Sequence, residues 1–124
     1  MPPTKERVAV LGASARPEKY SYMAVQLLAK CGHTPLPVHP SGKEVSGVPT
    51  AKNLADLEKP IDTLTLYVGP DNSNKLIADI VAVRPRRIIM NPGAENPALK
   101  SEAERAGIEV VEGCTLVMLK TGTF

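Results

Sequence analysis

Short apolar runs recur along the chain with the spacing of buried strands. Five continuous runs, typical of strands covered on both faces, predict strands at residues 7–11, 34–38, 63–68, 88–90 and 108–111. Pro35 and Pro37 lie in the second run and cannot donate to a sheet ladder, so we expect this strand at a sheet edge. Glycine or proline follows each run within two residues, which predicts a turn after every strand.

Helical spacing of apolar residues appears between the first two strands. A helix is predicted over residues 20–31, and Gly32 supplies its C-terminal stop. Because they recur every three or four positions, five residues are expected to form its apolar face: Met23, Ala24, Leu27, Leu28 and Cys31. This pattern assigns Cys31 to the core.

Two further helices are predicted in the second half of the chain. Asp71 or Ser73 is expected to cap the first of them. Its apolar face comprises Leu76, Ile77, Ile80 and Val81. Asn96 as cap and Pro97 as first residue predict the next helix, which ends at Gly107.

The remaining segments are predicted to be short or irregular. Residues 42–52 are rich in glycine, proline and small polar side chains, so we expect a surface loop with a short extended piece at 45–48. Residues 53–58 form a short helix at most, and the apolar tail 114–119 suits a final helical turn or two.

This alternation of strands and helices predicts an α/β fold in one domain, residues 1–124. We expect a Rossmann-like, doubly wound, mainly parallel five-stranded sheet in a three-layer αβα arrangement, with right-handed crossovers. The predicted strand order is second, first, third, fourth, fifth. Ligands bind where such an order reverses, at the carboxyl ends of the strands. Residues 12–21 and 69–73 should therefore line a crevice, with 38–43 and 91–94 beside them.

Composition excludes several classes of partner. The net charge is +2 and only 3% of the 124 residues are aromatic, which argues against a general nucleic-acid binder. Apolar runs fall short of the ~20 residues that cross a bilayer. Two cysteines are too few for a disulfide scaffold and lie too far apart for a zinc site, so no metal is expected. We therefore expect a cytoplasmic protein that binds neither nucleic acid nor membranes.

The turn after the first strand carries groups that bind phosphate. Gly12 lets a ligand approach the backbone closely, and Ala13 and Ser14 follow with main-chain N–H groups and a hydroxyl. Arg16 and Lys19 add positive charge ahead of a helix N-terminus. A full G-x-G-x-x-G motif is absent, because Ser14 replaces the second glycine. The alternative is a plain strand-to-helix turn with a solvated Arg16.

The end of the second strand discriminates between nucleotides. NAD-binding folds place an acidic residue near this point, whereas here His39 and Pro40 precede Ser41 and Lys43. A lysine and a hydroxyl suit a phosphorylated ribose, which favours coenzyme A (CoA) or NADP over NAD. Taken alone, Lys43 is equally a solvated loop lysine, and His39 is a packing residue as readily as a ligand contact. His33, beside Gly32, is interpreted only as a helix-terminus residue.

These motifs occur in an order that resembles a known family. The chain resembles the small, stand-alone CoA-binding domain proteins, similar in fold to the amino-terminal domain of the succinyl-CoA synthetase alpha subunit. The resemblance covers nearly the whole chain and rests on residues 8–14, Pro17, Tyr20-Ser21, His39-Pro40, Gly42-Lys43, Tyr67-Val68, Asn91-Pro92-Gly93-Ala94 and Gly113-Cys114-Thr115. It implies CoA as the cofactor.

The resemblance also implies roles for individual residues. Gly12, Ala13, Ser14 and Arg16, with Lys19, Tyr20 and Ser21 nearby, would hold the diphosphate region. Lys43 would meet the 3′-phosphate. The adenosine would be bordered by Val38, His39 and Pro40, and the passage toward the pantetheine arm by Tyr67, Val68, Gly69 and Pro70. Asn91, Pro92 and Gly93 would lie near the thiol end.

Catalysis is not expected from this chain alone. The synthetase carries its phosphorylated histidine in a second domain that has no counterpart here, and neither histidine matches a catalytic motif. Hydrolytic constellations are also missing. The predicted function is CoA or acyl-CoA binding as a carrier, sensor or regulatory module. A small NADP-binding enzyme and a subunit completed by a partner chain are the alternatives, and a protein partner or a homo-oligomer stays open.

Two further motifs have less specific interpretations. We expect Cys114 at the start of the last helix, where a helix N-terminus favours a thiolate, and we hypothesise a mixed disulfide with the CoA thiol. A buried, unreactive cysteine is the alternative. The basic run at residues 84–87 precedes the fourth strand and is expected to be a solvated turn at the end of the sheet opposite the crevice.

Overall fold

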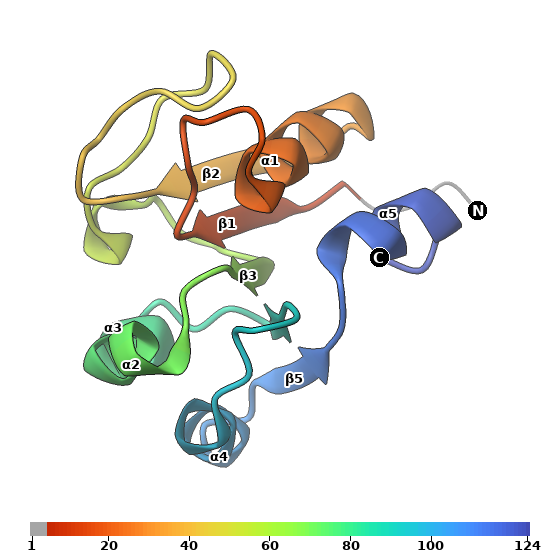
Figure 1. Ribbon diagram of the computed structural model, residues 1–124. Coiled ribbons are helices and arrows are strands. Elements are labelled where there is room, and N and C mark those ends of the chain that lie inside the picture. The colour runs from red at the N-terminus through yellow and green to blue at the C-terminus, as the bar shows by residue number, and fades with distance from the viewer. Residues whose placement is uncertain (1–4) are drawn as a thin grey trace.

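The computed structural model describes residues 5–124 and contains one parallel five-stranded sheet (Figure 1). The strand order is β2-β1-β3-β4-β5, and every neighbouring pair is parallel. The bounds are β1 Arg7–Leu11, β2 Thr34–Val38, β3 Thr63–Leu66, β4 Arg87–Met90 and β5 Glu109–Glu112. The predicted fold class, strand order and edge position of β2 are all confirmed.

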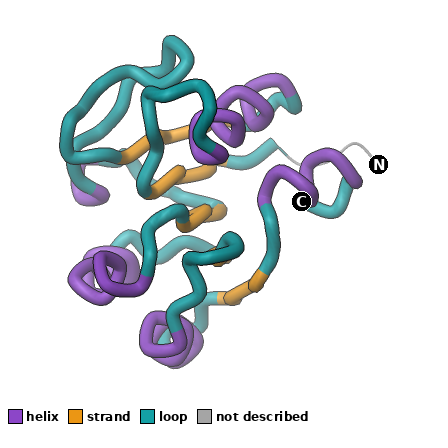
Figure 2. Tube along the Cα trace, viewed as in Figure 1, coloured by secondary structure: helices purple, strands orange, loops and turns teal. Residues whose placement is uncertain are grey.

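Helices cover both faces of the sheet (Figures 1 and 2). α1 (Tyr20–Lys30) and α5 (Thr115–Thr121) pack on one face, where they contact each other. The other face carries α2 (Pro70–Ser73), α3 (Ile77–Ala82) and α4 (Pro97–Arg105), together with the 3-10 turns η1 (Leu54–Asp56) and η2 (Asn74–Leu76). This is the predicted three-layer arrangement.

The core is aliphatic and divided by the sheet into two clusters. Ala9, Leu64 and Ile88 point toward the α3 and α4 layer, where Ile80 and Leu99 are also fully buried. Alternate strand residues Val8 and Val10 point toward α1, where they meet Val25 and Leu28. Strands buried on both faces leave no polar side, which is why they form continuous apolar runs in the sequence.

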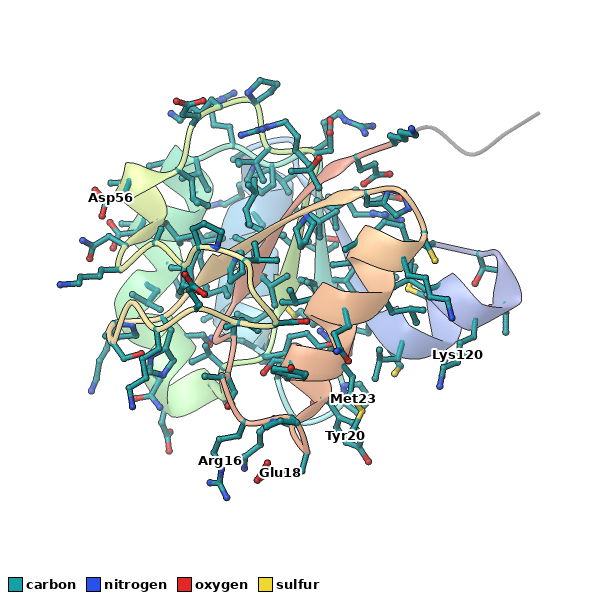
Figure 3. The ribbon with its side chains drawn as sticks, turned by 90° about the horizontal axis from the view of Figure 1, so that it is seen from above. Arg16, Glu18, Tyr20, Met23, Asp56 and Lys120 are labelled. Atoms are coloured by element: carbon teal, nitrogen blue, oxygen red, sulfur yellow. The ribbon has the colours of Figure 1, made fainter. Side chains whose placement is uncertain are left out.

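The predicted apolar face of the first helix is partly wrong. Cys31 is exposed, because α1 ends at Lys30 and Cys31 already has the non-helical conformation of a C-cap. Met23 is also exposed and lies on the outer side of α1 (Figure 3). The buried side chains of α1 are instead Ser21, Ala24, Val25 and Leu28.

The helical segment after β3 also differs from the prediction. It begins at Pro70, directly after Gly69, and neither Asp71 nor Ser73 caps it. The segment is divided into α2, η2 and α3 rather than forming one helix. Ser73 is buried and its hydroxyl accepts a 2.7 Å hydrogen bond from Asn96 Nδ2, which ties this segment to the start of α4.

Asn96 is the N-cap of α4, as predicted. Its Oδ1 accepts a hydrogen bond from Leu99 N at 3.1 Å. The tail is a complete helix, α5, that begins after Cys114. Residues 5–124 include no helix with the length and apolar character required to span a bilayer.

Arg87 departs from the expected solvated turn, whereas Arg84 and Arg86 are exposed. Its Nε donates to Thr63 Oγ1 at 3.1 Å, and its Nη2 lies 3.5 Å from Glu6 Oε1. The guanidinium also stacks 4.6 Å from the centre of the Phe124 ring. Arg87 thus helps to attach the last residue to the end of the sheet opposite the crevice.

Candidate functional site

A chamber of about 830 Å³ opens where the strand order reverses, in the size range of ligand pockets. Gly12 and the 38–40 segment line it from β1 and β2, and the 67–69 segment lines it from the end of β3. Residues 52–55 and the α2–α3 region close the other sides. The structure therefore places a cavity at the predicted point of the fold.

A second cavity of about 230 Å³ lies beside the chamber. Its lining residues are Ala13, Ser14, Ala15, Arg16, His39, Ser41 and Lys43. His39 contributes to both cavities, so they meet at the turn after β2. The turn after β1 and the turn after β2, separated by a whole helix in sequence, are thus brought together as predicted.

Gly12 lies at the centre of this arrangement and has no room for a side chain. Its N–H donates to Val38 O at 3.0 Å and its φ is +90°. A Cβ atom there would lie 2.7 Å from Val68 Cγ2 and 3.2 Å from the Tyr67 carbonyl carbon. Glycine is required here because the segment after β3 fills the space that a side chain would need, and because a positive φ favours glycine.

The loop between Gly12 and α1 presents main-chain donors. Ser14 Oγ accepts from Arg16 N at 3.1 Å, which folds the loop back on itself. Within residues 5–124, the N–H groups of Ser14 and Ala15 have no hydrogen-bond partner. α1 then begins after Lys19, which provides no side-chain cap, so the positive end of α1 remains uncapped.

Arg16 is a charged and exposed residue of the same loop. It forms a 2.9 Å ion pair with Glu18, and both side chains project from the loop into solvent (Figure 3). The pKa of Glu18 lies below its ordinary value, chiefly because a backbone N–H donates to the carboxylate and secondarily because of the charge of Arg16. An exposed pair of this kind is weak, so a phosphate can displace Glu18.

His39 shapes the turn that carries Lys43. Its Nδ1 accepts from Ser41 N at 3.0 Å and lies 2.9 Å from Ser41 Oγ, while its carbonyl accepts from Gly42 N. Ser41 Oγ in turn accepts from Lys43 N at 3.3 Å. The geometry therefore gives His39 a positioning role at the boundary between the two cavities.

Tyr67 combines a place in the chamber wall with a buried hydroxyl. Its ring packs with the apolar cluster beneath α1, and its Oη has no hydrogen-bond partner in the described part of the chain. Burial raises the pKa of Tyr67 to about 12, and the nearby Cys114 adds to this rise, while the Thr115 and Thr65 hydroxyls oppose it. The two threonines bond each other at 2.7 Å.

Asn91 is buried and its amide is fully used inside the protein. Nδ2 donates to Thr65 Oγ1 at 2.7 Å and to Leu66 O at 2.9 Å, while Oδ1 accepts from Thr115 N at 2.9 Å. Pro92 and Gly93 are exposed beyond it. Asn91 therefore joins β3, β4 and α5, and it presents no free polar atom to a ligand.

Several predicted site residues line neither cavity. They are Lys19, Tyr20, Ser21, Pro70, Asn91, Pro92, Gly93 and Cys114. Tyr20 is 71% exposed on the outer side of α1, whereas Ser21 is buried beneath it. Cys114 is half-buried at the N-cap of α5, close to Tyr67.

Part of the chamber wall was not predicted from the sequence. It includes Lys52, Asn53, Lys75 and Asp79, whereas Asn72 lies in the predicted 69–73 segment. The 42–52 loop returns to the sheet, since Ala51 N donates to Pro37 O at 3.0 Å and His39 N donates to Ala51 O at 2.9 Å. Only the single β-bridge between Ala51 and Val38 brings this loop to the crevice, and one bridge is too short to produce an apolar run in the sequence.

The model of a family described as CoA binding domain matches residues 6–120. The chain belongs to the CoA-binding domain family. Among curated relatives, the uncharacterized protein YneT of Bacillus subtilis (strain 168) is 32% identical over 62 residues, which make up 50% of this chain and 46% of YneT. The aligned part thus spans about half the length of each protein.

Solved structures share the fold of this CoA-binding domain. The crystal structure of an uncharacterized protein is 37% identical, with a TM-score of 0.88 over 98% of this chain and 100% of that one. The Thermus thermophilus protein described as cell-free ID.343 is 28% identical, with a TM-score of 0.88 over 97% and 91% of the two chains.

A larger enzyme contains a domain of the same fold. The dinucleotide-forming acetyl-coenzyme A synthetase 1 of Ca. Korarchaeum cryptofilum has a TM-score of 0.73 and 21% identity, covering 87% of this chain and 25% of the synthetase. At this identity the likeness concerns the fold alone.

The residues of the two cavities fit the chemistry of CoA. Within the described residues, the N–H groups of Ser14 and Ala15, which line the smaller cavity, have no hydrogen-bond partner. The charged side chains that line the cavities are mostly basic: Arg16, Lys43, Lys52 and Lys75, against the single carboxylate of Asp79. Such a set suits a ligand that carries several phosphate charges.

Proposed function

We propose that this chain binds CoA or an acyl-CoA in the crevice at the ends of β1, β2 and β3, as a carrier, sensor or regulatory module without catalysis of its own. The observation that carries the proposal is the junction of the two cavities at His39. A loop with free N–H groups, suited to phosphate, meets a chamber of ligand size there, which is the arrangement that one extended ligand would need.

The lining of each cavity suggests which part of CoA it holds. The loop of the smaller cavity, with Ser14, Ala15 and Arg16, suits the diphosphate. The larger chamber has apolar walls at Leu11, Val38, Leu54, Val68 and Leu76, which suit the adenine ring. Because the 38–40 and 67–69 segments line the same chamber, we place adenosine between them and do not assign the second segment to the pantetheine passage.

The polar groups beside the crevice favour binding over acid–base catalysis. Asn91, Thr65 and Thr115 satisfy one another. Burial keeps the pKa of Tyr67 at about 12, so its hydroxyl stays protonated and is a poor general base near neutral pH. These contacts leave no positioned proton acceptor among them. A partner chain that supplies one would change the function from carrier to enzyme subunit.

Thermal unfolding in the presence of candidate ligands tests this function. A ligand that binds only the native state raises the melting temperature, and at a given concentration a tighter ligand raises it further. CoA and acetyl-CoA should stabilise the chain, and NAD should not. Stabilisation by NADP without any by CoA would overturn the proposal in favour of an NADP-binding protein.

A further inference from the structure

Lys52 approaches the turn after β2 from a loop that contributes no strand to the sheet. Ala51 forms a parallel bridge with Val38, held by hydrogen bonds to Pro37 O and from His39 N at 3.0 and 2.9 Å. The backbone before Lys52 is therefore fixed against the carboxyl end of the edge strand. Its side chain starts beside the 39–43 turn, although residue 52 lies nine positions beyond Lys43 in the sequence.

The stem of Lys52 crosses that turn at Gly42. A Cβ built on Gly42 would lie 3.1 Å from Lys52 Cε and 3.3 Å from Lys52 Cγ. Gly42 has a φ of +66°, so both its conformation and the space taken by Lys52 favour glycine. Lys52 lines the chamber and Lys43 lines the smaller cavity, so the two lysines flank the junction at His39.

Neither lysine is neutralised by the protein. Within residues 5–124, no carboxylate lies within ion-pair distance of Lys43 or Lys52. Arg16, the other cation of the smaller cavity, is paired with Glu18, and Asp56 at the end of η1 accepts a hydrogen bond from Asn53. A phosphate monoester carries a charge of about −1.5 to −2, so it would supply the counter-charge that these two lysines lack.

We propose that Lys52 is a second cation of the subsite for the ribose phosphate, so that the crevice selects adenine nucleotides with a phosphorylated ribose. This inference rests on the proposed function and extends it to a ligand class. Adenosine 3′,5′-bisphosphate carries the same phosphorylated ribose as CoA and belongs to this class. CoA with its 3′-phosphate and NADP with its 2′-phosphate share this chemistry, whereas dephospho-CoA and NAD lack it.

Isothermal titration calorimetry with four variants tests the inference. Lys52→Met keeps most of the stem over Gly42 and removes the charge. It should weaken CoA about tenfold and dephospho-CoA less than twofold, the loss expected for a charged hydrogen bond. Lys52→Arg should retain the preference for CoA. Lys75→Met, from the opposite wall, should weaken both ligands equally, and Lys43→Met should resemble Lys52→Met.

The outcomes separate this inference from the proposed function. CoA binding with equal losses of CoA and dephospho-CoA in Lys52→Met would overturn the role of Lys52 and leave the function standing. Adenosine 3′,5′-bisphosphate should bind the wild-type chain more tightly than adenosine 5′-monophosphate, and the reverse order would also overturn it. Tight NADP binding without CoA binding would reject the proposed CoA function and support the proposed subsite for a phosphorylated ribose. Failure of every phosphorylated nucleotide to bind would reject both proposals.

Discussion

Gly12 and Val68 lie so close together that a Cβ atom on Gly12 would approach Val68 Cγ2 to 2.7 Å. This contact joins the end of β1 to the segment after β3 at the reversal of strand order. The backbone of Tyr67 approaches the same position, at 3.2 Å. The close approach of these two segments therefore depends on the missing side chain of Gly12.

Substituting Gly12 by alanine should damage stability and ligand binding together. We expect the unfolding free energy to fall by about 2–4 kcal/mol, because the clash adds to the ~1–2 kcal/mol cost of a positive φ. Urea unfolding measures the loss. Gly47→Ala is the control, since Gly47 has a φ of +77° but no neighbour within 4 Å, so it should cost about 1 kcal/mol. Equal losses in the two variants would show that the close contact is unimportant.

The Tyr67 phenol should titrate with a pKa of about 12. The change in ultraviolet absorbance of the phenolate measures this titration. In the unfolded chain its pKa is near 10, so between pH 10 and 12 the native state holds a proton that the unfolded state has lost. Stability should therefore fall as the pH rises through this window, by about 2 kcal/mol. Tyr67→Phe should abolish this step and change stability little at neutral pH, because the hydroxyl has no partner. Titration of all tyrosines near pH 10 would contradict the burial of this group.

Asn91 should be a structural residue rather than a ligand contact. Asn91→Ala removes three buried hydrogen bonds and should lower the unfolding free energy by about 2–4 kcal/mol in urea. Asn53→Ala removes an exposed amide and should cost less than about 0.5 kcal/mol. A stable Asn91→Ala variant with weakened CoA binding would instead support the role that the family resemblance implied.

We hypothesise that the Cys114 thiol forms a mixed disulfide with CoA. Its thiolate would attack CoA disulfide, forming a protein–CoA disulfide and releasing one CoA thiolate. We expect mass spectrometry to find one CoA on Cys114 in a Cys31→Ser background, because Cys31 is exposed and would react without selectivity. A Cys31→Ser protein that stays unmodified would refute this hypothesis. The matched control is Cys114→Ser in the same Cys31→Ser background, which should take up no CoA.

Most of the fold was predictable because parallel strands under two helical layers must be apolar throughout. The β1 and β3 runs, the cap at Asn96 and the glycine after β1 follow from local physics, and the reversal of strand order then places the crevice. The family relationship agrees with this deduction. Local signals were sufficient wherever neighbouring residues in sequence determine the structure.

Prediction failed where distant segments decide the environment. Cys31 has the spacing of a core residue, but the helix ends one position earlier. Arg87 looks solvated in sequence, yet Glu6 and Phe124, from the two ends of the chain, surround it. Lys52 joins the crevice only because Ala51 bridges to Val38. None of these contacts has a sequence period that a local pattern could reveal.

Nuclear magnetic resonance titration of the ¹⁵N-labelled chain with CoA tests the central claim most directly. The largest amide shifts should fall on Gly12, Ser14, Ala15, Gly42 and Gly69, around the junction of the two cavities. Residues 84–87, at the opposite end of the sheet, should shift little. Shifts concentrated on residues 84–87, or a spectrum that CoA leaves unchanged, would contradict the claim that the crevice binds CoA.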